Sequence, residues 1–152
     1  MNKNFDSATM LTRYINCKHI ITNEFNEKKL NLKRSERTVA DNLRLEKGLI
    51  HEVDYFKELS KKYKKVKNIK VLKNSSKEEK IKETNKALKE GYELIYGGWL
   101  KTGNWSGELD FLEINNEVKS NLGNYSYEIT DTKNSQKVKG DHIYQVCLYS
   151  FL

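Results

Sequence analysis

Two residues near the end of the chain have the types and the spacing of a site that handles phosphate. Asp131 and Lys133 lie in the run YSYEITDTKN (125–134), which alternates like a β-strand. Strand side chains alternate with period two, so the face that carries Tyr127 and Ile129 also carries Asp131 and Lys133. A carboxylate and an ammonium at the packed side of a strand predict a chemical site.

A second carboxylate is expected beside them. Asp110 lies in GELDFL (107–112), in the strand that precedes this one along the chain. Two carboxylates, the Thr132 carbonyl and waters are oxygen ligands of the kind that Mg²⁺ or Mn²⁺ takes. Such an ion lowers the pKa of a bound water and neutralises the charge of phosphate oxygens. The Lys133 ammonium would favour the hydroxide form of that water and help to stabilise the charged phosphate. The pattern therefore predicts a metal site for phosphodiester hydrolysis.

Simpler interpretations of these residues stay open. In a lysine-rich chain, D-x-K also forms surface salt bridges, and an aspartate in a strand is often an edge carboxylate. Glu108 has the same parity as Asp110 and is a lesser candidate, whereas Glu128 lies on the opposite face and is left out. The site is favoured by its combination with Gln145 and Tyr149, four residues apart on one helix face. Their alternative role is core packing.

The elements that position these residues divide one domain, 1–152, into a helical part (1–91) and a part with the sheet and the motifs (92–152). The patterns predict helices at 7–23, 36–63, 76–90 and 141–152, strands at 92–102, 105–116 and 127–133, and an edge strand in 66–74. A turn at 102–104 would join the first two strands as a hairpin. The predicted class is α/β, with a central mixed sheet flanked by helices.

Local signals set several of these boundaries. Ser7 is a candidate N-cap, Ser76 and Glu79 have capping-box spacing, and Gly91 is a natural helix stop. In the helix at 36–63 one apolar stripe is expected to pack, and His51 lies off it; the stripe contains Leu45, Leu49, Val53, Phe56 and Leu59. The last helix is apolar nearly all round and has no stop signal, so we expect it to be covered and the chain to be truncated in mid-fold.

Composition restricts the partners. The 152 residues carry a net charge of +7, with 37% hydrophobic and 11% aromatic residues. A basic chain of this size favours a nucleic-acid partner, although lysine-rich composition alone accounts for such a charge equally well. Lysines of the segment 60–73 are candidates for backbone contacts. The sequence has no secretory signal, no apolar run long enough to span a membrane, and only two cysteines. We therefore expect no membrane partner and a cytoplasmic location.

In this order the motifs resemble the RecB-like branch of the PD-(D/E)XK nuclease superfamily. The matching segments are ATMLTRYINCKH (8–19), GLIHE (48–52), GELDFL (107–112), YEITDTK (127–133) and YQVCLYS (144–150). The resemblance implies a restriction-endonuclease-like core and a Mg²⁺- or Mn²⁺-dependent (exo)deoxyribonuclease acting on DNA in repair, recombination or defence. It also implies a possible attached helicase or additional C-terminal domain.

The resemblance assigns a role to each matching residue. His51, Asp110, Asp131 and Thr132 would hold the metal, and Lys133 would be the catalytic lysine. Gln145 and Tyr149 would orient Lys133 or the DNA backbone. Without the resemblance, His51 would be read as an ordinary surface residue.

Some RecB-like nucleases also hold a [4Fe–4S] cluster, with one cysteine before the core and three after it. Cys17 precedes the core, but Cys147 lies inside the last helix, and four thiolates are needed. Cys17 and His19 are too few ligands for zinc. We therefore expect neither centre in this chain.

Two other classes of function remain open. The chain could be a non-catalytic nucleic-acid-binding fragment of such a nuclease, or a regulatory domain in which these charges only form salt bridges. A nuclease would show metal-dependent cleavage, whereas a binding fragment would not. A regulatory domain would not be stabilised by divalent metal, whereas a protein with a metal site would be.

Overall fold

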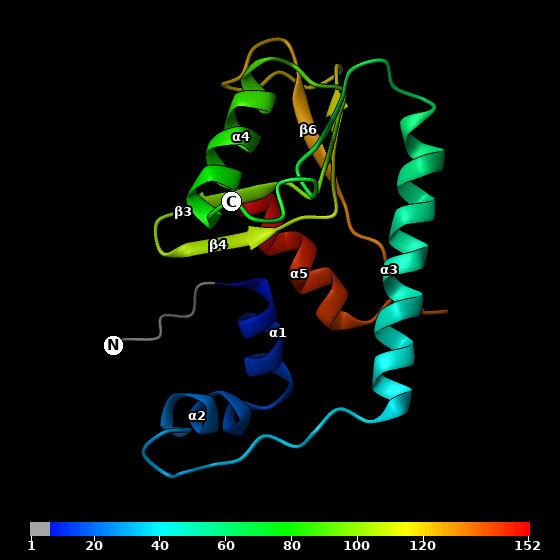
Figure 1. Cartoon of the computed structure of the whole chain (residues 1–152). Coiled ribbons are helices and arrows are strands. Elements are labelled where there is room, and N and C mark those ends of the chain that lie inside the picture. The colour runs from blue at the N-terminus through cyan, green and yellow to red at the C-terminus, as the bar shows by residue number, and fades with distance from the viewer. Residues whose placement is uncertain (1–6) are drawn as a thin grey trace.

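The computed structural model describes residues 7–152 and has an α/β fold with a mixed sheet (Figure 1). Its helices are α1 (Ala8–Asn16), α2 (Lys18–Asn26), α3 (Val39–Ser60), α4 (Lys77–Lys89) and α5 (Gly140–Phe151). Its strands are β1 (Val66–Asn68), β2 (Leu94–Tyr96), β3 (Trp99–Thr102), β4 (Trp105–Glu108), β5 (Phe111–Asn115) and β6 (Ser126–Thr130). The α/β class and the mixed sheet are confirmed.

The main sheet has the strand order β1-β2-β5-β6. Strand β1 is parallel to β2, and β5 is antiparallel to both β2 and β6. Strands β1, β2 and β6 therefore run in one direction. Their carboxyl ends meet at the edge where β5 begins, and the register there pairs Phe111 with both Tyr96 and Thr130. Ligand sites of α/β sheets form at such edges.

Both long strands predicted at 92–102 and 105–116 are broken in the structure. Gly97 has φ +69°, in the left-handed region, and the chain there leaves the main sheet for the β3–β4 hairpin. Two hydrogen bonds hold the crossing: Gly97 N donates to the Asp110 carbonyl and Leu109 N donates to that of Gly98, both at 2.8 Å. The break places Asp110 in the short connection between β4 and β5, at the sheet edge, and the hairpin turn itself is confirmed.

Helices cover both faces of the main sheet (Figure 1). Period-two alternation divides the strand residues between them. Leu94, Tyr96 and Phe111 pack with Leu59 of α3. The intervening residues pack with Ala87 of α4 on the other face; they include Ile95 and Leu112.

The predicted caps are confirmed. The Ser7 hydroxyl accepts from Met10 N at 3.2 Å, and Ser76 and Glu79 form a capping box. Gly91 ends α4 with φ +61°. The single helix predicted at 7–23 is wrong, because Cys17 is extended (φ −161°, ψ 105°) and separates α1 from α2.

The packing predicted for α3 is half right. Leu59 is buried, and Phe56 stacks on Tyr96 with ring centroids 4.3 Å apart. Leu49 is 61% exposed and Leu45 is exposed too, because the amino-terminal half of α3 stands away from the sheet. Val53, in the other half of the helix, is also exposed. Helix α5 buries Tyr149 but exposes its residues Ile143, Tyr144 and Phe151, so the prediction that it is covered on several sides is wrong for the described residues.

No helix in the described range 7–152 combines the length and the apolar character needed to cross a membrane.

Candidate active site

The structure brings Asp110 against the end of β6. Both Thr132 N and Thr132 Oγ1 donate hydrogen bonds to Asp110 Oδ2, each at 2.8 Å. These two bonds connect residues 22 positions apart in the sequence. The prediction that the G-x-x-D and D-x-K motifs share one place is consistent with this contact. Thr132 reaches Asp110 through its amide and hydroxyl, whereas the sequence suggested a role for its carbonyl.

Asp131 and Lys133 follow β6, which ends at Thr130, and are paired with each other. The Asp131 side chain is 4% exposed and forms an ion pair with Lys133, whose side chain is 31% exposed. Burial raises the pKa of Asp131 above its usual value, the negative charge of Asp110 raises it further, and Lys133 opposes both. The ionised carboxylate is thus held at a free-energy cost, in a place where a cation would relieve it.

Helix α5 supplies the predicted amide and phenol. Gln145 Nε2 donates to Tyr149 Oη at 3.0 Å, so the two side chains do share one face. Burial raises the pKa of Tyr149, and the charges of Asp131, Asp110 and Glu108 add to this effect. The Tyr149 phenol therefore faces the carboxylates of the site.

Gly107 makes room for this tyrosine. A Cβ atom at position 107 would lie 2.5 Å from Tyr149 Cε1, closer than atoms of a packed side chain approach. The glycine of the G-x-x-D motif is thus explained by packing, since α5 can approach β4 only where β4 has no side chain.

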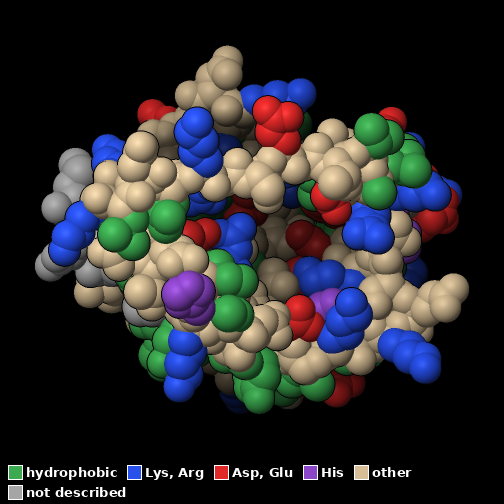
Figure 2. Space-filling view, turned by 90° about the horizontal axis from the view of Figure 1, so that it is seen from below, with side chains coloured by type: hydrophobic (Ala, Val, Ile, Leu, Met, Phe, Trp, Pro, Cys, Tyr) green, Lys and Arg blue, Asp and Glu red, His purple; other side chains and the backbone are tan. Residues whose placement is uncertain are grey.

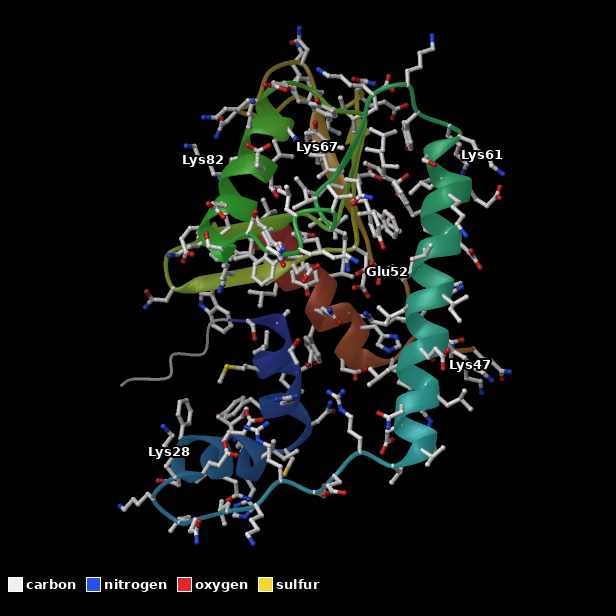
Figure 3. The ribbon with its side chains drawn as sticks, in the orientation of Figure 1. Lys28, Lys47, Glu52, Lys61, Lys67 and Lys82 are labelled. Atoms are coloured by element: carbon white, nitrogen blue, oxygen red, sulfur yellow. The ribbon has the colours of Figure 1, made fainter. Side chains whose placement is uncertain are left out.

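The structure does not bring His51 into this cluster. His51 is exposed on α3, and the described residues give it no hydrogen bond or ion pair with Asp110 or Asp131. Its neighbour Glu52 is 9% exposed and points from α3 towards the sheet (Figure 3). A metal role for His51 stays a prediction.

Glu52 belongs to a second charged group beside the first, with Lys70 and Glu108. Lys70 Nζ lies 2.8 Å from Glu52 Oε1 and 3.2 Å from Glu108 Oε1. Burial raises the pKa of Tyr96 to about 12, and the charges of Glu52 and Asp110 contribute. Tyr96 thus lies between the two groups.

Sequence reasoning missed Glu52 and Lys70. A signal for Glu52 was present: it lies four residues before Phe56 and seven before Leu59, on the half of α3 that packs. A carboxylate on a packed face is stable only if it is paired with a cation or a hydrogen-bond donor. Lys70 carried no such signal, because both its partners are distant in the sequence.

A cavity of about 520 Å³ adjoins the site, between the segment after β6 and α5. Asp131 and Lys133 lie on its lining together with His142. Its remaining wall includes the apolar side chains of Val138, Ile143, Val146 and Cys147. Viewed from below, the molecule is hollowed near its centre, with acidic side chains inside and basic ones around them (Figure 2).

The donor set suits a hard divalent cation. Asp110 and Asp131 are two adjacent carboxylates whose mutual repulsion a cation would remove. In the arrangement described for residues 7–152, no three side chains of His, Cys, Asp or Glu converge as a ligand set. Thr132 and Lys133 are the partners of the two aspartates here. Cys17 and Cys147 are both free and exposed.

Comparison of the chain with protein families, with curated proteins and with solved structures found no match.

Proposed function

We propose that this protein is a metal-dependent nuclease of the RecB-like type that hydrolyses phosphodiester bonds in DNA. The observation that supports this most is the meeting of Asp110 with the Asp131–Lys133 pair at one edge of the sheet. These residues come from separate segments, and their types match the chemistry expected from the sequence. The resemblance of the motifs supplies the nuclease class.

Asp110, Asp131 and the Thr132 carbonyl would hold Mg²⁺ or Mn²⁺. When bound, the cation would supply Lewis-acid activation of water and neutralise phosphate charge. Displacement of Lys133 from Asp131 would free the ammonium to orient the attacking water and to stabilise charge that develops on the phosphate. Asp110 keeps its position through the two Thr132 hydrogen bonds.

Tyr149 and Gln145 act as positioning residues in this proposal. The buried Tyr149 ring fills the space over Gly107 and holds α5 against the carboxylates. The Gln145 amide fixes the direction of the phenol. The cavity beside Lys133 would receive the nucleotide attached to the reacting phosphate, and its apolar wall suits the face of a base.

A second candidate function is nucleic-acid binding without cleavage. The same structure offers one observation in its favour: protein groups already satisfy both aspartates. If these contacts persist in solution, Asp110 and Asp131 are structural. The net charge of +7 would then serve binding alone.

The test is cleavage of end-labelled single-stranded and double-stranded DNA in EDTA, Mg²⁺ or Mn²⁺, comparing the wild type with Asp131→Ala. We expect cleavage with metal only, and its loss in Asp131→Ala. Glu128→Ala is the matched control, because Glu128 is an exposed carboxylate that binds Asn115 away from the site. Metal-independent binding with no cleavage by folded wild-type protein would favour the second candidate.

A further inference from the structure

Lys70 is held between carboxylates from two different elements. It follows β1, and its ammonium lies 2.8 Å from Glu52 of α3 and 3.2 Å from Glu108 of β4. The side chain of Glu52 is 12% exposed, and that of Lys70 is 31% exposed. Burial alone would lower the pKa of Lys70, but the two carboxylates outweigh burial and raise the pKa above its usual value. Lys70 is therefore charged.

The backbone leaves room for this lysine. A Cβ atom at Gly97 would collide with Lys70 Cγ, so the aliphatic part of the lysine side chain crosses directly over a glycine. The ammonium also lies 5.5 Å from the centroid of the Tyr96 ring, within the range of a cation–π contact. Two carboxylates, one ring face and a glycine thus fix the position of Lys70.

An ordinary salt bridge of this protein looks different. Lys67, three residues earlier, pairs with Glu83 alone at 2.9 Å on the face of α4. Lys70 instead bridges two carboxylates, and Glu108 is two residues from Asp110. The charges of Glu108, Asp110 and Asp131 all contribute to the raised pKa of the Tyr149 phenol, after burial. Four carboxylates therefore share this region with two lysines.

We propose that the ammonium of Lys70 is a tethered cation that occupies a second cation position, formed by Glu52 and Glu108. This proposal rests on the proposed divalent site at Asp110 and Asp131. It assigns one divalent ion to the wild-type protein, at those aspartates. Without the Lys70 ammonium, Glu52 and Glu108 would hold a second ion. The carboxylates would need to move inwards by only about 1 Å to reach the metal–oxygen distances of Mg²⁺.

The test counts bound Mn²⁺ by isothermal titration calorimetry and electron paramagnetic resonance, without any cleavage assay. Lys70→Met keeps the aliphatic volume and removes the charge. We expect it to bind one more Mn²⁺ than the wild type. Lys70→Arg keeps a charge and should keep the wild-type count. Lys67→Met is the matched control, since it removes a paired lysine from the same segment outside the cluster, and it should also keep the wild-type count.

A further variant locates the added ion. In Lys70→Met/Glu52→Gln/Glu108→Gln the carboxylates are gone, and the count should return to that of the wild type. Equal counts for folded Lys70→Met and wild type would overturn the proposal. If Lys70→Met is unfolded in EDTA, circular dichroism with Mn²⁺ decides: recovery of the folded spectrum supports the proposal, and persistent unfolding contradicts it.

The numbers of Mn²⁺ ions bound by the wild type and by Lys70→Met distinguish failure of the Lys70 proposal from failure of the proposed function. If the wild type binds no Mn²⁺ and Lys70→Met binds one ion, Lys70 is a tethered cation but the assignment of Asp110 and Asp131 as metal ligands fails. If the wild type binds one ion and Lys70→Met also binds one, the Lys70 proposal fails and the nuclease proposal stands.

Discussion

At the scale of single residues, the site is defined by an unfavourable charge. Asp131 is almost fully buried, with Asp110 adjacent and Lys133 as its ion-pair partner. Burial and the neighbouring carboxylate together outweigh the lysine, so the pKa of Asp131 is raised. Charge held at a cost to stability is typical of functional sites.

This charge gives a stability prediction for Asp131→Asn in EDTA. Because the native pKa is raised, ionising Asp131 costs stability: the cost is absent below the unfolded pKa of about 3.9 and complete above the native pKa. We expect Asp131→Asn to raise Tm at pH 7 by about 2–4 °C, and to lose this advantage near pH 3.5. Thermal unfolding at both pH values measures it.

Glu128→Gln is the control for the Asp131→Asn measurement. It neutralises an exposed carboxylate on β6, three residues before Asp131, and should leave Tm nearly unchanged at both pH values. A lower Tm for Asp131→Asn at pH 7 would mean that the ion pair with Lys133 outweighs the burial of the carboxylate.

At the scale of elements, local signals predicted three of the four expected helices but missed the break at Cys17, and long-range contacts determine the arrangement of the strands. The caps at Ser7 and Ser76 and the stop at Gly91 depend on a few neighbouring residues, so the sequence reveals them. The break of the long strands at Gly97 depends on the crossing to β5, and a strand pattern does not encode it. Likewise, the sequence pointed to Asp110 and Asp131, but Lys70 acquires its partners only in the fold.

Two glycines, both in motifs, give opposite predictions for substitution by alanine. Gly107→Ala places a Cβ against the buried Tyr149 ring and should destabilise the fold by about 1–3 kcal/mol. Gly48→Ala meets nothing within 4 Å in the middle of α3 and should stabilise it by about 0.5–1 kcal/mol. Guanidinium unfolding measures both, and equal effects would contradict the packing role of Gly107.

At the scale of the whole molecule, several lysines of the segment 60–73 have ammonium groups that already bind a partner within the protein. Lys61 pairs with Glu58, Lys67 with Glu83, and Lys70 with Glu52 and Glu108. The Lys65 ammonium donates to the Glu90 carbonyl. The sequence could not reveal the partners of Lys65, Lys67 and Lys70, because these partners lie on α3, α4, β4 and the turn after α4. We therefore restrict the expectation that this segment follows the phosphate backbone to the exposed lysines whose ammonium has no ion pair or hydrogen bond among the described residues: Lys62, Lys64 and Lys73.

This narrowing predicts how DNA affinity depends on salt. In EDTA, the slope of log affinity against log salt should become shallower in Lys62→Gln/Lys64→Gln/Lys73→Gln, by up to about 0.9 for each duplex phosphate that is no longer neutralised. Lys67→Gln should leave the slope unchanged, since Lys67 is paired with Glu83. Fluorescence anisotropy at several salt concentrations measures this. Identical slopes in the wild type and both variants would exclude a role for Lys62, Lys64 and Lys73 in DNA binding.

The most direct test of the nuclease proposal compares cleavage and Mn²⁺ affinity in one variant, Lys133→Met. Lys133 is proposed to act on the water and the phosphate while the aspartates hold the ion, so we expect cleavage to fall to the EDTA background with Mn²⁺ affinity largely retained. Lys119→Met, at an exposed lysine outside the site, should cleave like the wild type. Retained cleavage in folded Lys133→Met would contradict the assignment of the active site.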